Sequence, residues 1–137
     1  MFDFISNLNP IELLLFLFVT MLFLHIIADF LVQNNFMATY KQKKNWKEYI
    51  KDGKYENDYK IVLLVHSFSW SFITFFPLLI YTKNIRYWIC VLIMNTFFHA
   101  LIDDSKCNDL TIDLVLDQLL HIIQIAISVI TSYFITL

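Results

Sequence analysis

The chain has 137 residues, of which 58% are hydrophobic and 16% are charged, and its formal net charge is −2. A soluble domain carries about 45–50% apolar and about 25% charged residues, and a core of this size has little room for 14 Phe, 7 Tyr and 3 Trp. The composition therefore excludes a disordered chain, a soluble enzyme domain and a nucleic-acid binder that relies on bulk positive charge, and it indicates an integral membrane protein.

Four apolar segments have the length expected of membrane-crossing helices, which need roughly 20 residues. The first follows Pro10, which suits the first turn of a helix. The third has only 16 residues, so its ends must lie close to the lipid headgroups. Asp113 is placed to cap the start of the fourth segment. We predict an all-α fold and one domain, a four-helix transmembrane bundle with spans at approximately 11–33, 61–81, 87–102 and 112–137.

No predicted span contains Gly, so close helix packing must depend on other small residues. The candidates are Ala28, Ser67, Ser71, Ala100, Ala126 and Ser128. The aromatic runs Phe68–Phe76 and Tyr87–Trp88 are expected to face lipid or the membrane interface.

The connecting segments indicate the orientation of the bundle. The long segment 39–60 contains seven of the ten basic residues, Lys41 among them, and the connection 103–113 adds Lys106, whereas the other face has two. The positive-inside rule therefore predicts that both connections are cytoplasmic and that both termini lie outside. Within the Lys-rich loop, Trp46, Tyr49 and Ile50 are spaced for a short interfacial helix that would attract anionic headgroups, and a solvated loop that only sets topology is the alternative.

Ionisable residues interrupt the apolar spans. All four histidines lie in spans, and three of them are four residues from an Asp, which places each His and its Asp on one helical face. Because neighbouring helices run in opposite directions, these groups reach one membrane level, on the side of the long loop. The resulting candidate metal ligands are His25, Asp29, His66, His99, Asp103, Asp117 and His121.

A mixed nitrogen and oxygen ligand set suits Zn, Mn or Fe better than Ca, and seven candidates are enough for one or two divalent transition-metal ions. Taken alone, His66 is more simply a hydrogen-bonded packing residue, and Asp103 could mark the membrane interface. The joint occurrence of the pairs at one depth favours a functional site, because burying so many ionisable groups without partners is costly.

The same residues resemble the family called domain of unknown function 3307, which comprises small membrane proteins of bacteria and their phages. The resemblance covers nearly the whole chain, in the order His25-Ile-Ile-Ala-Asp29-Phe-Leu-Val-Gln33, His66, His99-Ala-Leu-Ile-Asp103 with Lys106, and Asp117-Gln118-Leu-Leu-His121. It implies that these positions form the family's polar signature and that the protein lies in the bacterial inner membrane, but it implies no activity.

Three functions fit these features. The first is a metal-dependent hydrolase at the cytoplasmic leaflet, with Asp117 and Lys106 as catalytic residues and with Gln33, Gln118 and Lys106 contacting an anionic lipid or phosphate substrate. The second is ion or proton translocation, although the polar residues of the sequence stop at one leaflet. The third is a non-catalytic accessory protein with a structural metal. The expected partner is the lipid bilayer, not nucleic acid, and a homo-oligomer is left open.

Overall fold

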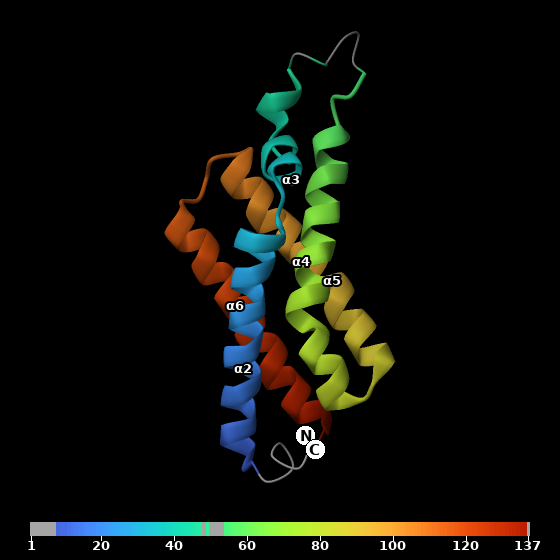
Figure 1. Ribbon diagram of the computed structural model, residues 1–137, viewed down its shortest axis with the longest axis vertical. Helices are drawn as coiled ribbons and strands as arrows, with labels where there is room; N and C mark the ends of the chain where they lie inside the picture. The colour runs from blue at the N-terminus through green and yellow to red at the C-terminus, as the bar shows by residue number, and fades with distance from the viewer. Residues whose placement is uncertain (1–7, 48, 50–53, 137) are drawn as a thin grey trace.

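The computed structural model describes residues 8–47, 49 and 54–136. Over these residues the chain forms helices and no strand, as predicted for an all-α fold. Four helical segments are long and apolar enough to cross a membrane, at Pro10–Val32, Asp58–Thr82, Ile85–Cys107 and Leu114–Thr136. The chain therefore has the build of a multi-pass membrane protein (Figure 1).

The first membrane segment consists of α2 (Pro10–Ile26) and a π-helical continuation, η1 (Ile27–Val32). Asn9 and Glu12 form a capping box at its start, with hydrogen bonds of 3.0 and 2.9 Å, and Pro10 occupies the first turn. Short π-helical turns inside helices often occur at functional sites. The wider turn ends at Gln33, whose backbone is extended.

A short segment folds back over the end of η1 before the next membrane helix begins. It contains α3 (Asn35–Tyr40), capped by the Asn34 side chain, and η2 (Lys43–Trp46), a turn of 3-10 helix. The predicted interfacial helix through Trp46, Tyr49 and Ile50 is represented here by η2 alone. Ile50 lies outside the described residues, and the rings of Trp46 and Tyr49 lie 6.1 Å apart between centroids.

The remaining membrane helices are α4 (Asp58–Thr82), α5 (Ile85–Cys107) and α6 (Leu114–Thr136). Helix α5 continues five residues beyond the predicted end at position 102. Its last turns carry Asp103 and Lys106, which bind Lys41 and Asp117 inside the protein, so these polar residues do not end the helix. Asp113 caps α6 as predicted, since its carboxylate accepts a hydrogen bond of 2.8 Å from the Leu116 amide.

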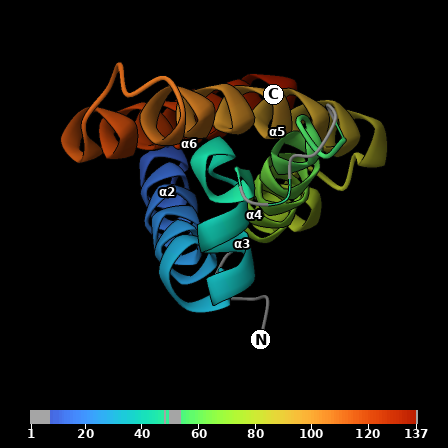
Figure 2. The ribbon, with the colours of Figure 1, turned by 90° about the horizontal axis from the view of Figure 1, so that it is seen from above.

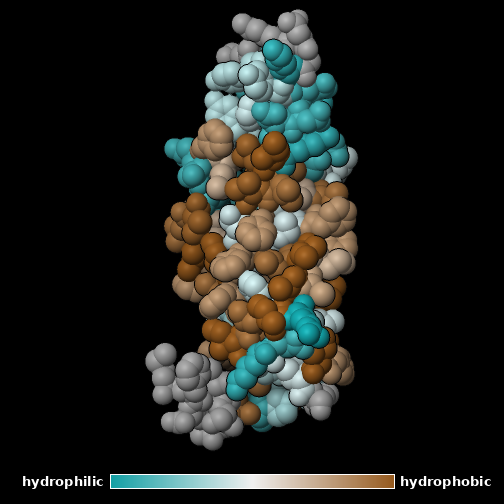
Figure 3. Space-filling model, turned by 90° about the vertical axis from the view of Figure 1, so that its right-hand side faces the viewer, coloured by the Kyte–Doolittle hydropathy of each residue, from teal (hydrophilic) through white to brown (hydrophobic). Residues whose placement is uncertain are grey.

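The helices form two layers, with α5 and α6 along one side and α2 and α4 along the other (Figure 2). The Lys-rich segment and the α5–α6 connection lie at one end of the bundle, and the α4–α5 turn lies at the other end (Figure 1). On the face shown in Figure 3, apolar side chains cover most of the middle, and hydrophilic ones gather at the end with the Lys-rich segment and in a smaller patch toward the other end. The predicted small contact residues that are fully buried are Ala28, Ser67, Ser71 and Ser128.

The aromatic runs do not all face outward. Phe68, Phe72 and Phe76 share one exposed face of α4, as expected from their spacing of four residues. The prediction is wrong for Trp70, which is 1% exposed, and for Phe75 and Trp88, which are also buried. The run 68–76 is longer than one helical turn, so it contributes side chains to both the lipid face and the core, and Trp88 lies on the inward face of α5.

Candidate functional site

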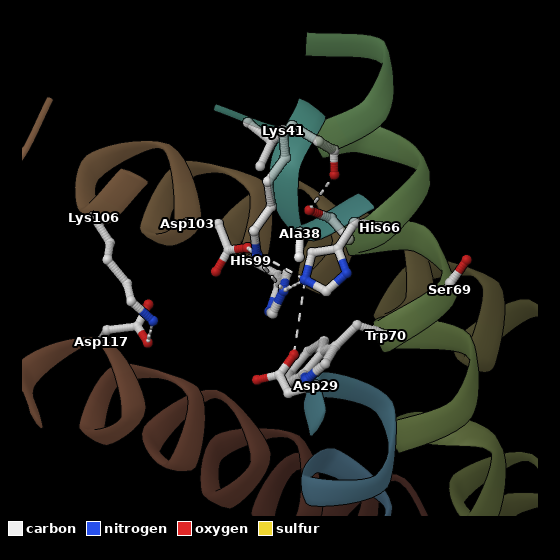
Figure 4. A network of polar contacts seen from close by, with 12 residues as sticks. Asp29, Ala38, Lys41, His66, Ser69, Trp70, His99, Asp103, Lys106 and Asp117 are labelled. Atoms are coloured by element: carbon white, nitrogen blue, oxygen red, sulfur yellow. Dashed lines mark hydrogen bonds and ion pairs between the residues drawn. The ribbon is translucent and has the colours of Figure 1, made fainter. Parts of the chain in front are cut away.

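All seven predicted ligand residues lie in one polar network inside the bundle (Figure 4 shows five of them). Helix α2 and its π-helical continuation contribute two of them, α4 one, α5 two and α6 two. Six of the seven are buried, and Asp29 is partly exposed. The π-helical turn carries Asp29 and directs its carboxylate toward His25 and His66.

At the centre of this network, the Nε2 atom of His66 faces three other polar atoms. It lies 3.2 Å from Asp103 Oδ2, 3.3 Å from His99 Nε2 and 3.7 Å from Asp29 Oδ1. A ring nitrogen carries at most one hydrogen, so a single hydrogen bond cannot satisfy all three neighbours. The Asp29 carboxylate accepts no hydrogen bond from any residue that the structure describes, and its contacts are these longer ones.

The ring of His121 is oriented by Gln124. The Gln124 amide nitrogen faces two oxygens of Asn95, at 3.3 and 3.4 Å, so its amide oxygen is the atom that lies 3.0 Å from His121 Nδ1. That oxygen can only accept, so Nδ1 carries a hydrogen and neutral His121 presents a lone pair at Nε2. This nitrogen lies 3.6 Å from an oxygen of Asp103 and 3.5 Å from an oxygen of Asp117. Acceptors that face one another in this way require a cation between them, either a proton or a metal ion.

Two groups of three side chains have ligand atoms close enough together to hold a metal ion, within 4.8 Å of one another. One contains Asp29, His66 and His99, and the other contains His99, Asp103 and His121. The His99 ring is shared by both groups and stacks against Trp70, at 4.1 Å between centroids, and against His121, at 4.2 Å, while Trp70 and His121 lie 5.3 Å apart. Among the described residues, three buried polar atoms of this network have no hydrogen-bond partner: His99 Nδ1, His121 Nε2 and Asp117 Oδ1.

His25 lies beside these groups and belongs to neither. The indole N–H of Trp70 donates to His25 Nδ1 at 2.8 Å, so this nitrogen acts as an acceptor. The opposite nitrogen then donates to the side-chain oxygen of Gln118 at 3.2 Å, and the Gln118 amide donates to Asp117 at 2.9 Å. Both ring nitrogens of His25 are therefore occupied, and Gln118 links His25 to Asp117.

Two lysines enclose the network at the end of the bundle that carries the Lys-rich segment. Lys106 donates to Asp117 at 2.6 Å, and Lys41 donates to Asp103 at 2.6 Å (Figure 4). Gln33 lies between Asp29 and Lys41: its amide donates to the Asp29 carbonyl at 3.1 Å and accepts from Lys41 at 3.2 Å. The predicted substrate residues Gln33, Gln118 and Lys106 thus all contact members of the network.

Sequence reasoning missed four members of this site: Lys41, Trp70, Asn95 and Gln124. Lys41 was counted among the loop lysines, and nothing in the sequence separates it from them. The other three had a signal, since Trp70 lies four residues after His66, Asn95 four before His99, and Gln124 three after His121.

The polar interior also extends further along the bundle than predicted. Asn95 donates to the Ser128 hydroxyl at 3.1 Å, and Thr74 of α4 and Ser132 of α6, which lie further along their helices from His66 and His121, are also buried. The statement that the polar residues stop at one leaflet is therefore wrong. Hydroxyl residues were overlooked because they also occur as ordinary packing contacts between membrane helices.

No curated protein and no solved structure matches the chain. The sequence model of one protein family, described as protein of unknown function (DUF3307), matches residues 17–137, which include every member of the polar network. The match covers most of the chain and confirms the resemblance seen in the polar residues. The chain therefore belongs to the DUF3307 family of proteins of unknown function.

Proposed function

We propose that this protein binds one or two divalent transition-metal ions within its bundle and hydrolyses a phosphate-containing substrate, such as a lipid, at the cytoplasmic leaflet. The observation that carries the proposal is the orientation of His121. Gln124 holds its Nδ1–H, and the free Nε2 lone pair faces the carboxylates of Asp103 and Asp117. A histidine that ligates a metal usually donates a hydrogen bond from one ring nitrogen to an oxygen and offers the lone pair of the other nitrogen to the cation.

The metal ligands in this proposal are the five residues of the two groups, Asp29, His66, His99, Asp103 and His121. A mixture of imidazole and carboxylate donors suits Zn, Mn or Fe. An ion held by these side chains would supply Lewis-acid chemistry toward a phosphoryl oxygen and a water molecule. In this proposal His25, a predicted ligand, orients Gln118 and, through it, Asp117.

Asp117 and Lys106 are the proposed catalytic pair. One oxygen of Asp117 accepts from Lys106 and Gln118, while the other is buried without a hydrogen bond from the described residues, and it can take a proton from an attacking water. Lys106 is partly exposed, so it can turn from Asp117 toward a substrate anion at the membrane surface. Gln33 and Gln118 supply neutral amide contacts on either side of the network.

The location of the network supports a substrate that is held at the membrane surface. The network lies toward the end of the bundle that carries the Lys-rich segment, with the lysines above it (Figure 4). Basic residues concentrate on cytoplasmic loops, which favours the inner leaflet of a bacterial inner membrane for this end.

The first test is the metal content of the detergent-purified protein by elemental mass spectrometry. We expect one or two transition-metal ions per chain, their loss in a His99→Ala/His121→Ala variant and their retention in Ser69→Ala, because Ser69 points away from the network (Figure 4). Asp117→Asn should keep the metal and lose hydrolysis of phosphate esters by about 10²- to 10⁴-fold. Absence of metal after reconstitution with Zn, Mn and Fe would overturn the proposal.

Proton translocation is the second candidate, and it is favoured by the polar interior on the far side of the network. A chain of hydrogen bonds leads from His121 through Gln124 and Asn95 to Ser128. Two further hydroxyls, those of Ser71 and Thr74, are buried without partners among the described residues. Proton flux into liposomes that is lost in Asn95→Leu, from protein that holds no metal, would favour this function over hydrolysis.

A further inference from the structure

A pocket of about 280 Å³ lies at the surface of the Lys-rich end, outside the polar network. It is lined by Lys43, Lys44, Lys47, Cys107, Asn108 and Leu110. The three lysines come from η2 and the residue that follows it, and the other residues come from the end of α5 and the connection to α6. Two segments that are far apart in the sequence therefore build this pocket together.

Among the residues that the structure describes, only one carboxylate pairs with a lysine of the pocket. Across the ranges 8–47, 49 and 54–136, no carboxylate lies within 4.0 Å of Lys44 or Lys47. Lys43 has one ion pair, 3.8 Å long, with Glu56, and both side chains are about half exposed. An exposed ion pair of this length contributes little to the stability of the fold. Three lysine side chains therefore line the pocket, and the Lys43 ammonium group also lies 6.0 Å from the centre of the Tyr59 ring.

Asn108 binds the backbone of the basic segment beside the pocket. Its side-chain oxygen accepts from the Lys43 amide at 2.7 Å, and its nitrogen donates to the Lys41 carbonyl at 3.2 Å and to Asp104 at 2.6 Å. Trp46 adds a hydrogen bond of 2.7 Å to the Tyr40 carbonyl. These bonds hold the backbone of the basic segment against the end of α5.

Apolar surface adjoins the basic pocket, which distinguishes a lipid from a soluble anion. Leu110, in the wall of the pocket, is 79% exposed. Trp46, next to Lys47 in the chain, lines an apolar groove of about 330 Å³. The other residues of this groove come from α3 and α4: Phe36, Met37, Asp58, Ile61, Val62 and Val65. Figure 3 shows the hydrophilic end of the molecule directly above the apolar belt. An anionic lipid at this level places its charge by the lysines and its chains along apolar side chains.

We propose that this pocket is a binding site for the phosphate headgroup of an anionic phospholipid. Three ammonium groups suit a phosphate with one or two negative charges, and the fixed backbone lowers the entropy cost of binding. This site is separate from the metal ligands, so it does not require the proposed hydrolysis. It is nevertheless close to them, because Asn108 binds the backbone of Lys41, whose side chain reaches Asp103.

The test measures lipid binding by native mass spectrometry on protein stripped of metal with a chelator, which keeps the result independent of the proposed function. Phosphatidylglycerol and phosphatidylcholine are titrated into the wild type, the triple variant K43Q/K44Q/K47Q and a control, K54Q/K60Q/K83Q, which makes the same charge change outside the pocket. We expect phosphatidylglycerol to bind the wild type and the control, and the triple variant to lose at least tenfold in affinity. The variant K43R/K44R/K47R should retain binding, which excludes misfolding as the cause of the loss.

Equal binding by the two triple glutamine variants would overturn the proposal, because the attraction would then come from general charge. Inorganic phosphate serves as the competitor that separates a lipid from a soluble anion. We expect millimolar phosphate to displace little phosphatidylglycerol. Complete displacement, or equal affinity for phosphatidylcholine, would show that the pocket does not recognise an anionic lipid.

Discussion

Lys41 and Asp103 form an ion pair of 2.6 Å inside the protein, although they are 62 residues apart in the chain. Their side chains are 10% and 5% exposed. The Asp103 carboxylate also faces His66, His99 and His121, so the lysine supplies a positive charge that the histidines supply only when they are protonated. The pair also fastens the α3–η2 segment over the polar network.

Replacement of Lys41 by Met should strongly destabilise the protein, because it leaves the buried Asp103 carboxylate without its cation. Removing one partner of a buried ion pair costs about 3–5 kcal/mol. Lys43→Met is the matched control, since the Lys43 ion pair is exposed and is expected to contribute less than about 1 kcal/mol. Thermal unfolding in detergent measures both, and equal midpoints for the two variants would contradict the importance of the buried pair.

Replacement of Gln124 by Leu should weaken metal binding without removing a ligand. The substitution leaves His121 Nδ1 without its acceptor, so the ring loses the orientation that points Nε2 at the carboxylates. Loss of such an orienting partner typically costs roughly 10–100-fold in metal affinity. Metal titration monitored by the rise in melting temperature measures the effect. Gln42→Leu is the control, because the Gln42 side chain bonds to the Ala38 carbonyl and, among the described residues, to no member of the network. An equal loss in this variant would refute the specific role of Gln124.

Replacement of Trp70 by Phe should allow the His25 ring to adopt both neutral tautomers. The indole N–H keeps His25 Nδ1 as an acceptor, so the wild-type ring should carry its hydrogen on Nε2, and the variant should show both tautomers in ¹⁵N spectra of the imidazole. The lost hydrogen bond should cost about 0.5–1.5 kcal/mol. Trp88→Phe removes another buried indole N–H, which bonds to the Phe75 carbonyl, and should leave the His25 signals unchanged. A single Nε2–H tautomer in both variants would show that Trp70 does not set it.

The predicted orientation can be tested with single cysteines. Lys54→Cys lies in the Lys-rich segment and Lys83→Cys lies in the α4–α5 turn, at the opposite end of the bundle, with Cys90 and Cys107 replaced by Ser. If the positive-inside rule holds, a membrane-impermeant maleimide should label only Lys83→Cys in intact cells and should label both variants after lysis. Labelling of Lys54→Cys in intact cells would show that the orientation is the opposite one and that the polar network lies toward the outer leaflet.

The sequence was sufficient to predict the helical class and the membrane setting, because both depend on composition and on the length of apolar segments. It also predicted which residues are candidates for the polar network. The helical repeat places His99 beside Asp103 and Asp117 beside His121 whatever the packing of the helices. The spacing along antiparallel helices then brings these pairs to one depth, and the structure has them in one network.

Helix rotation, side-chain direction and the path of the long connection were decided only by the tertiary structure. Periodicity does not show which face of α4 turns inward, so Trp70 could not be separated from its lipid-facing neighbours. The hydrogen bonds that orient His25 and His121 depend on which side chains from other helices lie within about 3 Å. Lys41 illustrates the limit most clearly. In sequence it is one of seven loop lysines, and it is buried because α3 folds back over the bundle, where the Asp103 carboxylate needs a cation.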